Sequence, residues 1–140
     1  MTKNSTSSPL TEQDKTTLRT AAYGAIALLT AADATGSPHK IATAGSIALG
    51  SATGLVGHVL AEKAEGAKLN GKSVAAIADV VLPALTEAMS LLNKQDPAEA
   101  DNFRNTINVA IEAATRARKG QPSPTVADMT RKINEALNAA

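Results

Sequence analysis

The stretch from Ile41 to Leu60 constrains the fold more than any other part of this chain. Its twenty residues include no Asp, Glu, Lys or Arg, and His58 is its only titratable side chain. It also contains four glycines among alanine, serine and threonine: Gly45, Gly50, Gly54 and Gly57. A segment without charge lacks the side chains that normally face water, so we expect other helices or lipid to cover it.

The composition predicts a single all-α domain. The chain has 140 residues, which is enough for one domain with a core and too few for two ordinary ones. Alanine is abundant, and the only aromatic residues are Tyr23 and Phe103. Because bulky side chains are scarce, we expect the helices to gain packing energy by close backbone approach. The absence of cysteine excludes disulfides, thiolate catalysis and Cys-based metal sites.

Capping residues predict where the first two helices begin. Residues 1–10 are polar and are expected to form a flexible N-terminal lead-in to a helical-bundle domain spanning residues 11–140. Thr11 is the expected N-cap of a first helix that ends near Asp33. Ser37-Pro38 then starts a second helix, expected to run to about Glu65. The alternative is a second helix broken into two at Gly50 or Gly54.

Similar start signals predict three further helices. Ser73 caps a third helix, which Pro83 is expected either to bend or to divide into two. Asp96-Pro97 begins a fourth helix, with Glu99 three residues after the cap, and Ser123-Pro124 begins a fifth. Five helices joined by short turns predict an antiparallel bundle in which sequence neighbours pack together. The small-residue second helix is expected to be central and the most buried.

Within the second helix, Ser46, Gly50 and Gly54 follow one another at four-residue spacing. This spacing places them on one ridge of a continuous helix. Each interior glycine costs about 1 kcal/mol relative to alanine, so a steric reason is expected for keeping them. We therefore predict that this ridge is an interaction surface against which another helix packs.

The titratable residues do not form a recognisable catalytic or metal-binding group. His39 and His58 lie nineteen positions apart, without a metal-ligand motif, and His58 is expected to pair with Glu62 on the surface. Asp33 and Asp79 are the carboxylates nearest apolar faces, and Asp79 is expected to point outward. The sequence thus predicts no catalytic residue, no metal site and no cofactor.

One segment matches a nucleotide-binding motif in its residue types and spacing. Residues 66–73, GAKLNGKS, match the phosphate-loop pattern through Gly66, Gly71, Lys72 and Ser73. A working phosphate loop follows a buried β-strand, whereas this segment follows a predicted helix that carries Glu62 and Glu65. The interpretation we favour is a helix–helix turn in which Ser73 caps the next helix.

Three short segments of the first and fourth helices are Leu18–Ala22, Gly24–Leu28 and Asp101–Arg104. These segments resemble a group of alanine-rich, all-helical bacterial proteins with no assigned function. The resemblance implies a compact helical domain, and it implies no site residue.

Three functional hypotheses follow. The first is a non-enzymatic helical module that binds a protein partner or itself. The second is a membrane-active protein that inserts Ile41–Leu60, which as one helix is about 30 Å long and would span a hydrocarbon core. The third is a nucleotide binder that uses Gly66–Ser73. We favour the first, in the cytoplasm. Nucleic acid is a disfavoured partner, because the net charge is only +1 and the chain shows no basic stripe with stacking aromatics.

Overall fold

The computed structural model describes residues 10–33, 38–62, 72–117 and 123–139, and these ranges are all-helical, with connecting turns and no strand. Six helices lie in them: α1 (Glu12–Ala32), α2 (Pro38–Gly50), α3 (Gly54–Ala61), α4 (Val74–Gln95), α5 (Pro97–Ala117) and α6 (Pro124–Asn138). The expected lead-in, apart from Leu10, lies outside the described residues. So do the turn before Lys72 and the basic residues Arg118 and Lys119.

Helices α1, α4, α5 and α6 begin where the local capping signals predicted. The Thr11 hydroxyl accepts a hydrogen bond from the Asp14 amide at 3.0 Å, and the Asp14 carboxylate accepts one from the Thr11 amide at 3.1 Å. Ser73 and Ser123 cap α4 and α6 through their hydroxyl groups. The Asp96 carboxylate accepts from the Ala98 amide at the start of α5. Each cap satisfies an amide that has no partner inside its own helix.

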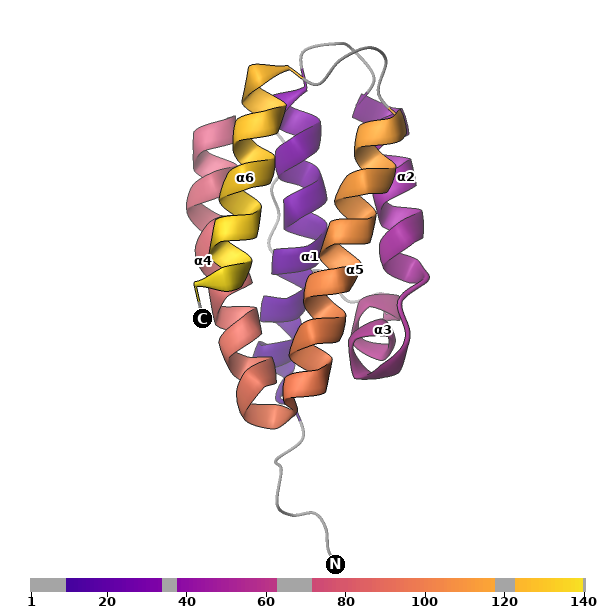
Figure 1. Ribbon diagram of the computed structural model, residues 1–140, viewed down its shortest axis with the longest axis vertical. Coiled ribbons are helices and arrows are strands. Elements are labelled where there is room, and N and C mark those ends of the chain that lie inside the picture. Colours follow the sequence, from indigo (N-terminus) through magenta and orange to yellow (C-terminus); the bar gives the residue numbers. More distant parts are fainter. Residues whose placement is uncertain (1–9, 34–37, 63–71, 118–122, 140) are drawn as a thin grey trace, which may run out of the picture.

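The helices form an elongated bundle in which α1 and α5 run in one direction and α2, α4 and α6 in the other (Figure 1). The most extensive packing joins α1 to α4 and α2 to α5, which are separated in the sequence. Helix α6 packs on α4 and α1, and the Thr86 hydroxyl donates to the Ala136 carbonyl across the α4–α6 contact. Since α4 and α6 run in the same direction, the bundle is not antiparallel throughout, and packing does not simply follow chain order.

Helix α1, rather than the charge-free segment, is the most buried helix. It packs against all five other helices, and several of its side chains are fully buried: Leu18, Ala21, Ala22, Ala25 and Leu28. Small residues around its circumference let neighbours approach from several sides. In α2 the buried residues are Ile41, Gly45 and Leu49, while much of its opposite side is exposed. The prediction that the second helix is the most buried was therefore wrong.

The stretch from Ile41 to Leu60 is not one helix. Helix α2 ends at Gly50, residues 51–53 form a turn, and α3 starts at Gly54 with φ of +72°, in the left-handed region that favours glycine. A Cβ atom at Gly57 would lie 2.2 Å from the Ala52 carbonyl oxygen, so the turn folds directly onto α3. The alternative prediction, that this segment is broken into two helices, is confirmed, and the prediction of one continuous helix is wrong.

Helix α4 continues through Pro83, which is exposed. Its buried side chains, from Ile77 to Leu92, lie on the face opposite to this proline. Pro83 therefore does not divide the helix, because the hydrogen bond that it removes lies on the side open to water.

Candidate functional site

Helix α3 is short, and its N-terminus is satisfied by side chains from α5. The α3 N-cap residue, Thr53, makes no side-chain capping bond. Instead the Glu99 carboxylate accepts from the Val56 amide at 3.2 Å, and the Asn102 side chain donates to the Thr53 carbonyl at 2.8 Å. A carboxylate at this position also complements the positive end of the helix dipole. Glu99, which the sequence predicted as a local cap of its own helix, thus caps another helix.

The C-terminus of α3 is satisfied by side chains from α1. The Arg19 side chain is 3% exposed, donates from Nε to the Val59 carbonyl at 3.2 Å and pairs with Glu62. The Tyr23 hydroxyl donates to the Leu60 carbonyl at 2.9 Å, and burial raises the pKa of that hydroxyl above its ordinary value. Glu62, expected beside His58, therefore binds Arg19. Charges of both signs hold this eight-residue helix at its two ends.

A matched pair of substitutions tests this account of capping. Ser73→Ala removes the hydroxyl that accepts from the Ala76 amide and should lower the free energy of unfolding by about 1 kcal/mol. Thr53→Ala should change it by less than about 0.5 kcal/mol, because Thr53 is exposed and its side chain caps nothing. Urea unfolding followed by circular dichroism measures both. An equal loss for the two variants would contradict capping of α3 by Glu99.

The predicted ridge of Ser46, Gly50 and Gly54 is not a helix-packing ridge within this fold. Ser46 and Gly50 are exposed on α2, and a Cβ atom at Gly50 would meet nothing within 4 Å. Gly54 belongs to α3, so the break ends the ridge. The close approach expected of small residues occurs instead at Gly45, where a Cβ atom would lie 2.7 Å from the Ile26 side chain. Whether Ser46 and Gly50 meet another molecule stays a prediction.

A shallow depression of about 240 Å³ lies between α2 and α5, which run side by side in Figure 1. None of the residues that line it is charged: Ala48, Ser51, Ala52, Thr53, Asn102, Asn105, Thr106 and Val109. Val109 is 55% exposed, and Ile47, one helical turn before Ser51, is 65% exposed. We call the surface around this depression the neutral face. It is made of the exposed residues that line the depression, Ser51, Thr53, Asn105 and Val109, together with Ile47 one helical turn before Ser51.

Charged residues border the neutral face at both ends. At one end Asp101, which is exposed and lies one helical turn before Asn105 on α5, pairs with Arg104 at 2.9 Å. At the other end Lys40 precedes the face on α2 and is exposed. On α5, Arg116 pairs with Glu112 at 3.1 Å, beyond Val109. Because α2 and α5 run in opposite directions (Figure 1), Lys40 and the Glu112–Arg116 pair lie toward the same end of the bundle. The sequence pattern singled out neither Ile47 nor Val109 as part of an interaction surface. Both could have been noticed as large apolar residues outside the buried stripes of their helices.

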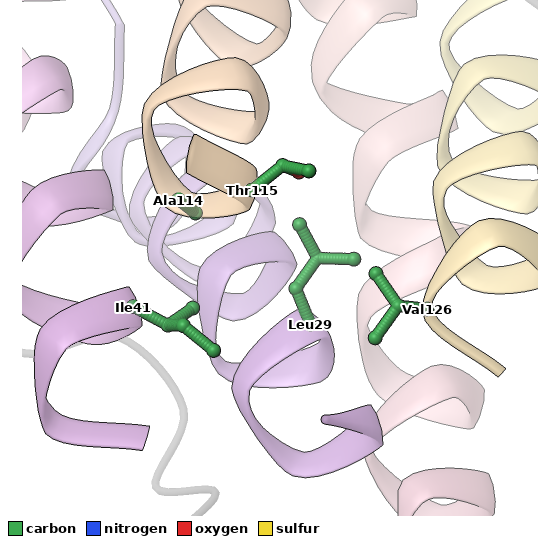
Figure 2. A pocket seen from close by; sticks show the side chains of 5 residues that line it. All are labelled: Leu29, Ile41, Ala114, Thr115 and Val126. Atoms are coloured by element: carbon green, nitrogen blue, oxygen red, sulfur yellow. The ribbon is translucent and has the colours of Figure 1, made fainter. Parts of the chain in front are cut away.

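A second hollow lies inside the bundle, where side chains from α1, α2, α5 and α6 point toward one another (Figure 2). Its lining consists of Leu29, Ile41, Ala114, Thr115 and Val126, and its volume is about 10 Å³. This is room for about one water molecule, and its one polar group, the Thr115 hydroxyl, already donates to the Ile111 carbonyl. The hollow is a packing imperfection rather than a ligand site.

The other candidate residues from the sequence remain apart. His39, His58 and Asp79 are all exposed, as expected for Asp79, and the described residues contain no group of three His, Asp or Glu side chains able to hold a metal ion. In the phosphate-loop motif, Gly66 and Gly71 lie outside the described residues, while Lys72 and Ser73 are exposed. The Ser73 hydroxyl caps α4, as the turn interpretation predicted.

The basic residues near the chain's end are paired with carboxylates. On α6, Arg131 contacts both Asp128 and Glu135, and Lys132 contacts Asp128 at 3.5 Å. The hydrogen bond from Arg131 is the main cause of a lowered pKa for the Asp128 carboxyl, whose side chain is 40% exposed. These alternating charges form a solvated helix face of the ordinary kind.

The fold changes which segment of the chain could span a membrane. Ile41–Leu60 is divided between α2 and α3, which have 13 and 8 residues and are each too short to cross a bilayer. Among the described helices, α4 is long and apolar enough to cross a membrane. Its most apolar 18-residue window has a mean hydropathy of 1.6, and 33% of that window is buried in the bundle. Core helices of soluble proteins pass the same test.

Comparison of this chain with known protein families, with curated proteins and with solved structures finds no match.

Proposed function

We propose that this protein is a non-enzymatic helical module that binds another protein chain through the neutral face. The observation that carries the proposal is the exposure of Ile47 and Val109 beside an uncharged depression. The described residues have two other exposed large apolar side chains, Tyr23 and Val80, and these are only 36% and 37% exposed. Of the two most exposed, Val109 lines the depression and Ile47 lies one helical turn before Ser51, which also lines it.

The chemistry of the neutral face favours a protein surface as the ligand. Covering the remaining exposed area of Ile47 and Val109 would contribute about 1 kcal/mol each. The alanine residues that line the depression let a helix approach closely, and no charge in the lining has to be desolvated. Asn105 offers donors and an acceptor that a partner's polar groups can satisfy, and the Ser51 hydroxyl, which donates to the Ile47 carbonyl at 3.0 Å, offers an acceptor. This arrangement resembles the apolar centre and polar surroundings of protein interfaces.

A surface kept for binding contributes little to the stability of the free protein. Changing both Ile47→Lys and Val109→Lys should therefore alter the free energy of unfolding by less than about 1 kcal/mol. Leu49→Lys, two residues from Ile47 but fully buried, should lower it by more than about 3 kcal/mol, because a charge would enter the core. Urea unfolding at low protein concentration measures the free energy of unfolding of the wild type, the double Lys variant and Leu49→Lys.

A large loss of stability in the double variant would overturn the proposal, since the two side chains would then serve the fold itself. The expected result is a double variant that unfolds at nearly the wild-type urea concentration while Leu49→Lys does not. Low concentration keeps association from contributing to the measured stability.

A further inference from the structure

Resting on the proposed function, we infer that α3 and the turn before it form one conformational switch that controls the neutral face. In the docked state this unit supplies part of the wall of the depression. When α3 undocks from α1 and α5, the depression loses that wall, while the bundle of the other described helices persists. A partner that needs the complete depression therefore binds the docked state and stabilises it.

The turn before α3 belongs to the depression and to α3 at the same time. Ser51, Ala52 and Thr53 line the depression, and α3 begins at the next residue. The Thr53 carbonyl accepts a hydrogen bond from the Asn102 side chain, which lines the depression from α5, and another from the Gly57 amide inside α3. Because a Cβ atom at Gly57 would lie 2.2 Å from the Ala52 carbonyl oxygen, α3 and the turn are in direct contact. Helix α3 therefore carries Thr53 away from Asn102 when it undocks.

Helix α3 depends on docking for its helical structure. It has 8 residues, and isolated helices shorter than about 12 to 15 residues are marginal in water. Side chains of α5, Glu99 and Asn102, satisfy its N-terminus, and side chains of α1, Arg19 and Tyr23, satisfy its C-terminus. Since so short a helix does not persist when only one end is held, we expect its two ends to open together.

Undocking of α3 should need much less free energy than unfolding of the bundle. The buried side chains of α3 are Val56, Val59 and Leu60, far fewer than α1 buries. Docking also holds the Arg19 guanidinium at 3% exposure, and undocking lets water reach this charge, which offsets part of the lost contacts. Elements with few buried apolar contacts open locally, ahead of the global transition.

Hydrogen exchange of the full chain, followed by NMR, tests the inference. Where closing is faster than exchange, the rate at each amide reports the free energy of the opening that exposes it. We expect the amides of Val56, Gly57 and Leu60 to share one opening. Relative to their unprotected rates, they should exchange at least about 100-fold faster than the buried amides of Ala25 in α1 and Ile107 in α5.

A matched pair of hydroxyl deletions separates undocking of α3 from global unfolding. Tyr23→Phe removes the hydrogen bond to the Leu60 carbonyl and should accelerate exchange of the α3 amides by roughly fivefold, at both ends of the helix. Thr86→Val removes an equivalent bond, to the Ala136 carbonyl between α4 and α6. It should accelerate the most protected amides of the bundle by a similar factor and leave the α3 amides unchanged, because the α4–α6 contact stays formed while α3 is undocked.

A second matched pair connects the depression with the far end of α3. Asn102→Ala removes the donor to the Thr53 carbonyl and should accelerate exchange of the Leu60 amide by roughly fivefold. Asn105→Ala changes another residue that lines the depression, three positions further along α5, and should leave that rate within about twofold of the wild type.

The inference is overturned if the two ends of α3 respond separately, so that Asn102→Ala leaves the Leu60 amide unchanged or Tyr23→Phe accelerates that amide alone. It is also overturned if Thr86→Val accelerates the α3 amides as much as the rest of the bundle, because α3 then opens only with the whole fold. Failure of the proposed function is recognised separately, by loss of stability in the double Lys variant of the neutral face during urea unfolding.

Discussion

Replacing Gly57 by alanine is expected to lower the free energy of unfolding by about 3 kcal/mol, although the change adds a single methyl group. The new Cβ atom would lie 2.2 Å from the Ala52 carbonyl oxygen and 2.5 Å from its carbonyl carbon. Both are backbone atoms, so no side chain can rotate away, and the whole turn between α2 and α3 must move. For a chain of this length the loss corresponds to a fall in Tm of about 10 °C, which differential scanning calorimetry measures.

Gly50→Ala provides the matched control. Gly50 is also a helical glycine of the same segment, but its Cβ atom would meet nothing within 4 Å. Alanine there should raise stability by about 0.5 to 1 kcal/mol, because it restricts the unfolded chain without a clash. The two glycines thus differ in the sign of the effect. A neutral result for Gly57→Ala would show that the turn does not lie as close to α3 as the structure places it.

This contrast shows how far the sequence could predict the packing. Two glycines of this segment do lie at tight contacts, Gly45 against the Ile26 side chain and Gly57 against the Ala52 carbonyl. The sequence alone placed the approach at Ser46, Gly50 and Gly54 instead. Four glycines in an uncharged segment do not reveal which of them faces a neighbour, because a turn at residues 51–53 changes the direction of everything that follows.

The helix starts were predictable because their signals are local. A serine or threonine cap and the amide that it accepts from are three residues apart, so the sequence contains the whole interaction. The break after Gly50 could only be offered as an alternative. The side chains that stabilise α3, namely Arg19, Glu99 and Asn102, lie forty or more residues away in sequence from the groups they bind. No spacing rule connects such residues.

The candidate site was only partly predictable for the same reason. The absence of charge between Ile41 and Leu60 was correctly recognised as unusual, and it was interpreted as a sign of burial. In the structure α2 lies at the edge of the bundle, and the uncharged residues opposite Gly45 are exposed. That exposure, combined with the exposure of Val109 on α5, which is distant from α2 only in the sequence, defines the neutral face.

Arg19 is expected to be the polar side chain whose loss most weakens the fold. Arg19→Ala should lower the free energy of unfolding by about 3 to 4 kcal/mol, because it removes a long buried side chain and leaves the Val59 carbonyl without its donor. Helix α3 should loosen first, since its other anchor at this end is the Tyr23 hydroxyl. Urea unfolding measures the total loss, and hydrogen exchange shows whether the amides of α3 lose protection before those of α1.

Two further variants separate packing from charge at this position. Arg19→Met keeps most of the volume but donates no hydrogen bond, so it should cost about 1 to 3 kcal/mol, the penalty for an unsatisfied buried carbonyl. Glu62→Gln should cost less than either Arg19 variant, because the amide oxygen can still accept the hydrogen bond from the buried Arg19 guanidinium and only the opposite charge is lost. The expected order of losses is therefore Arg19→Ala, then Arg19→Met, then Glu62→Gln. If Glu62→Gln were the most damaging of the three, the ion pair rather than the bond to Val59 would hold α3, and this account of its C-terminus would be wrong.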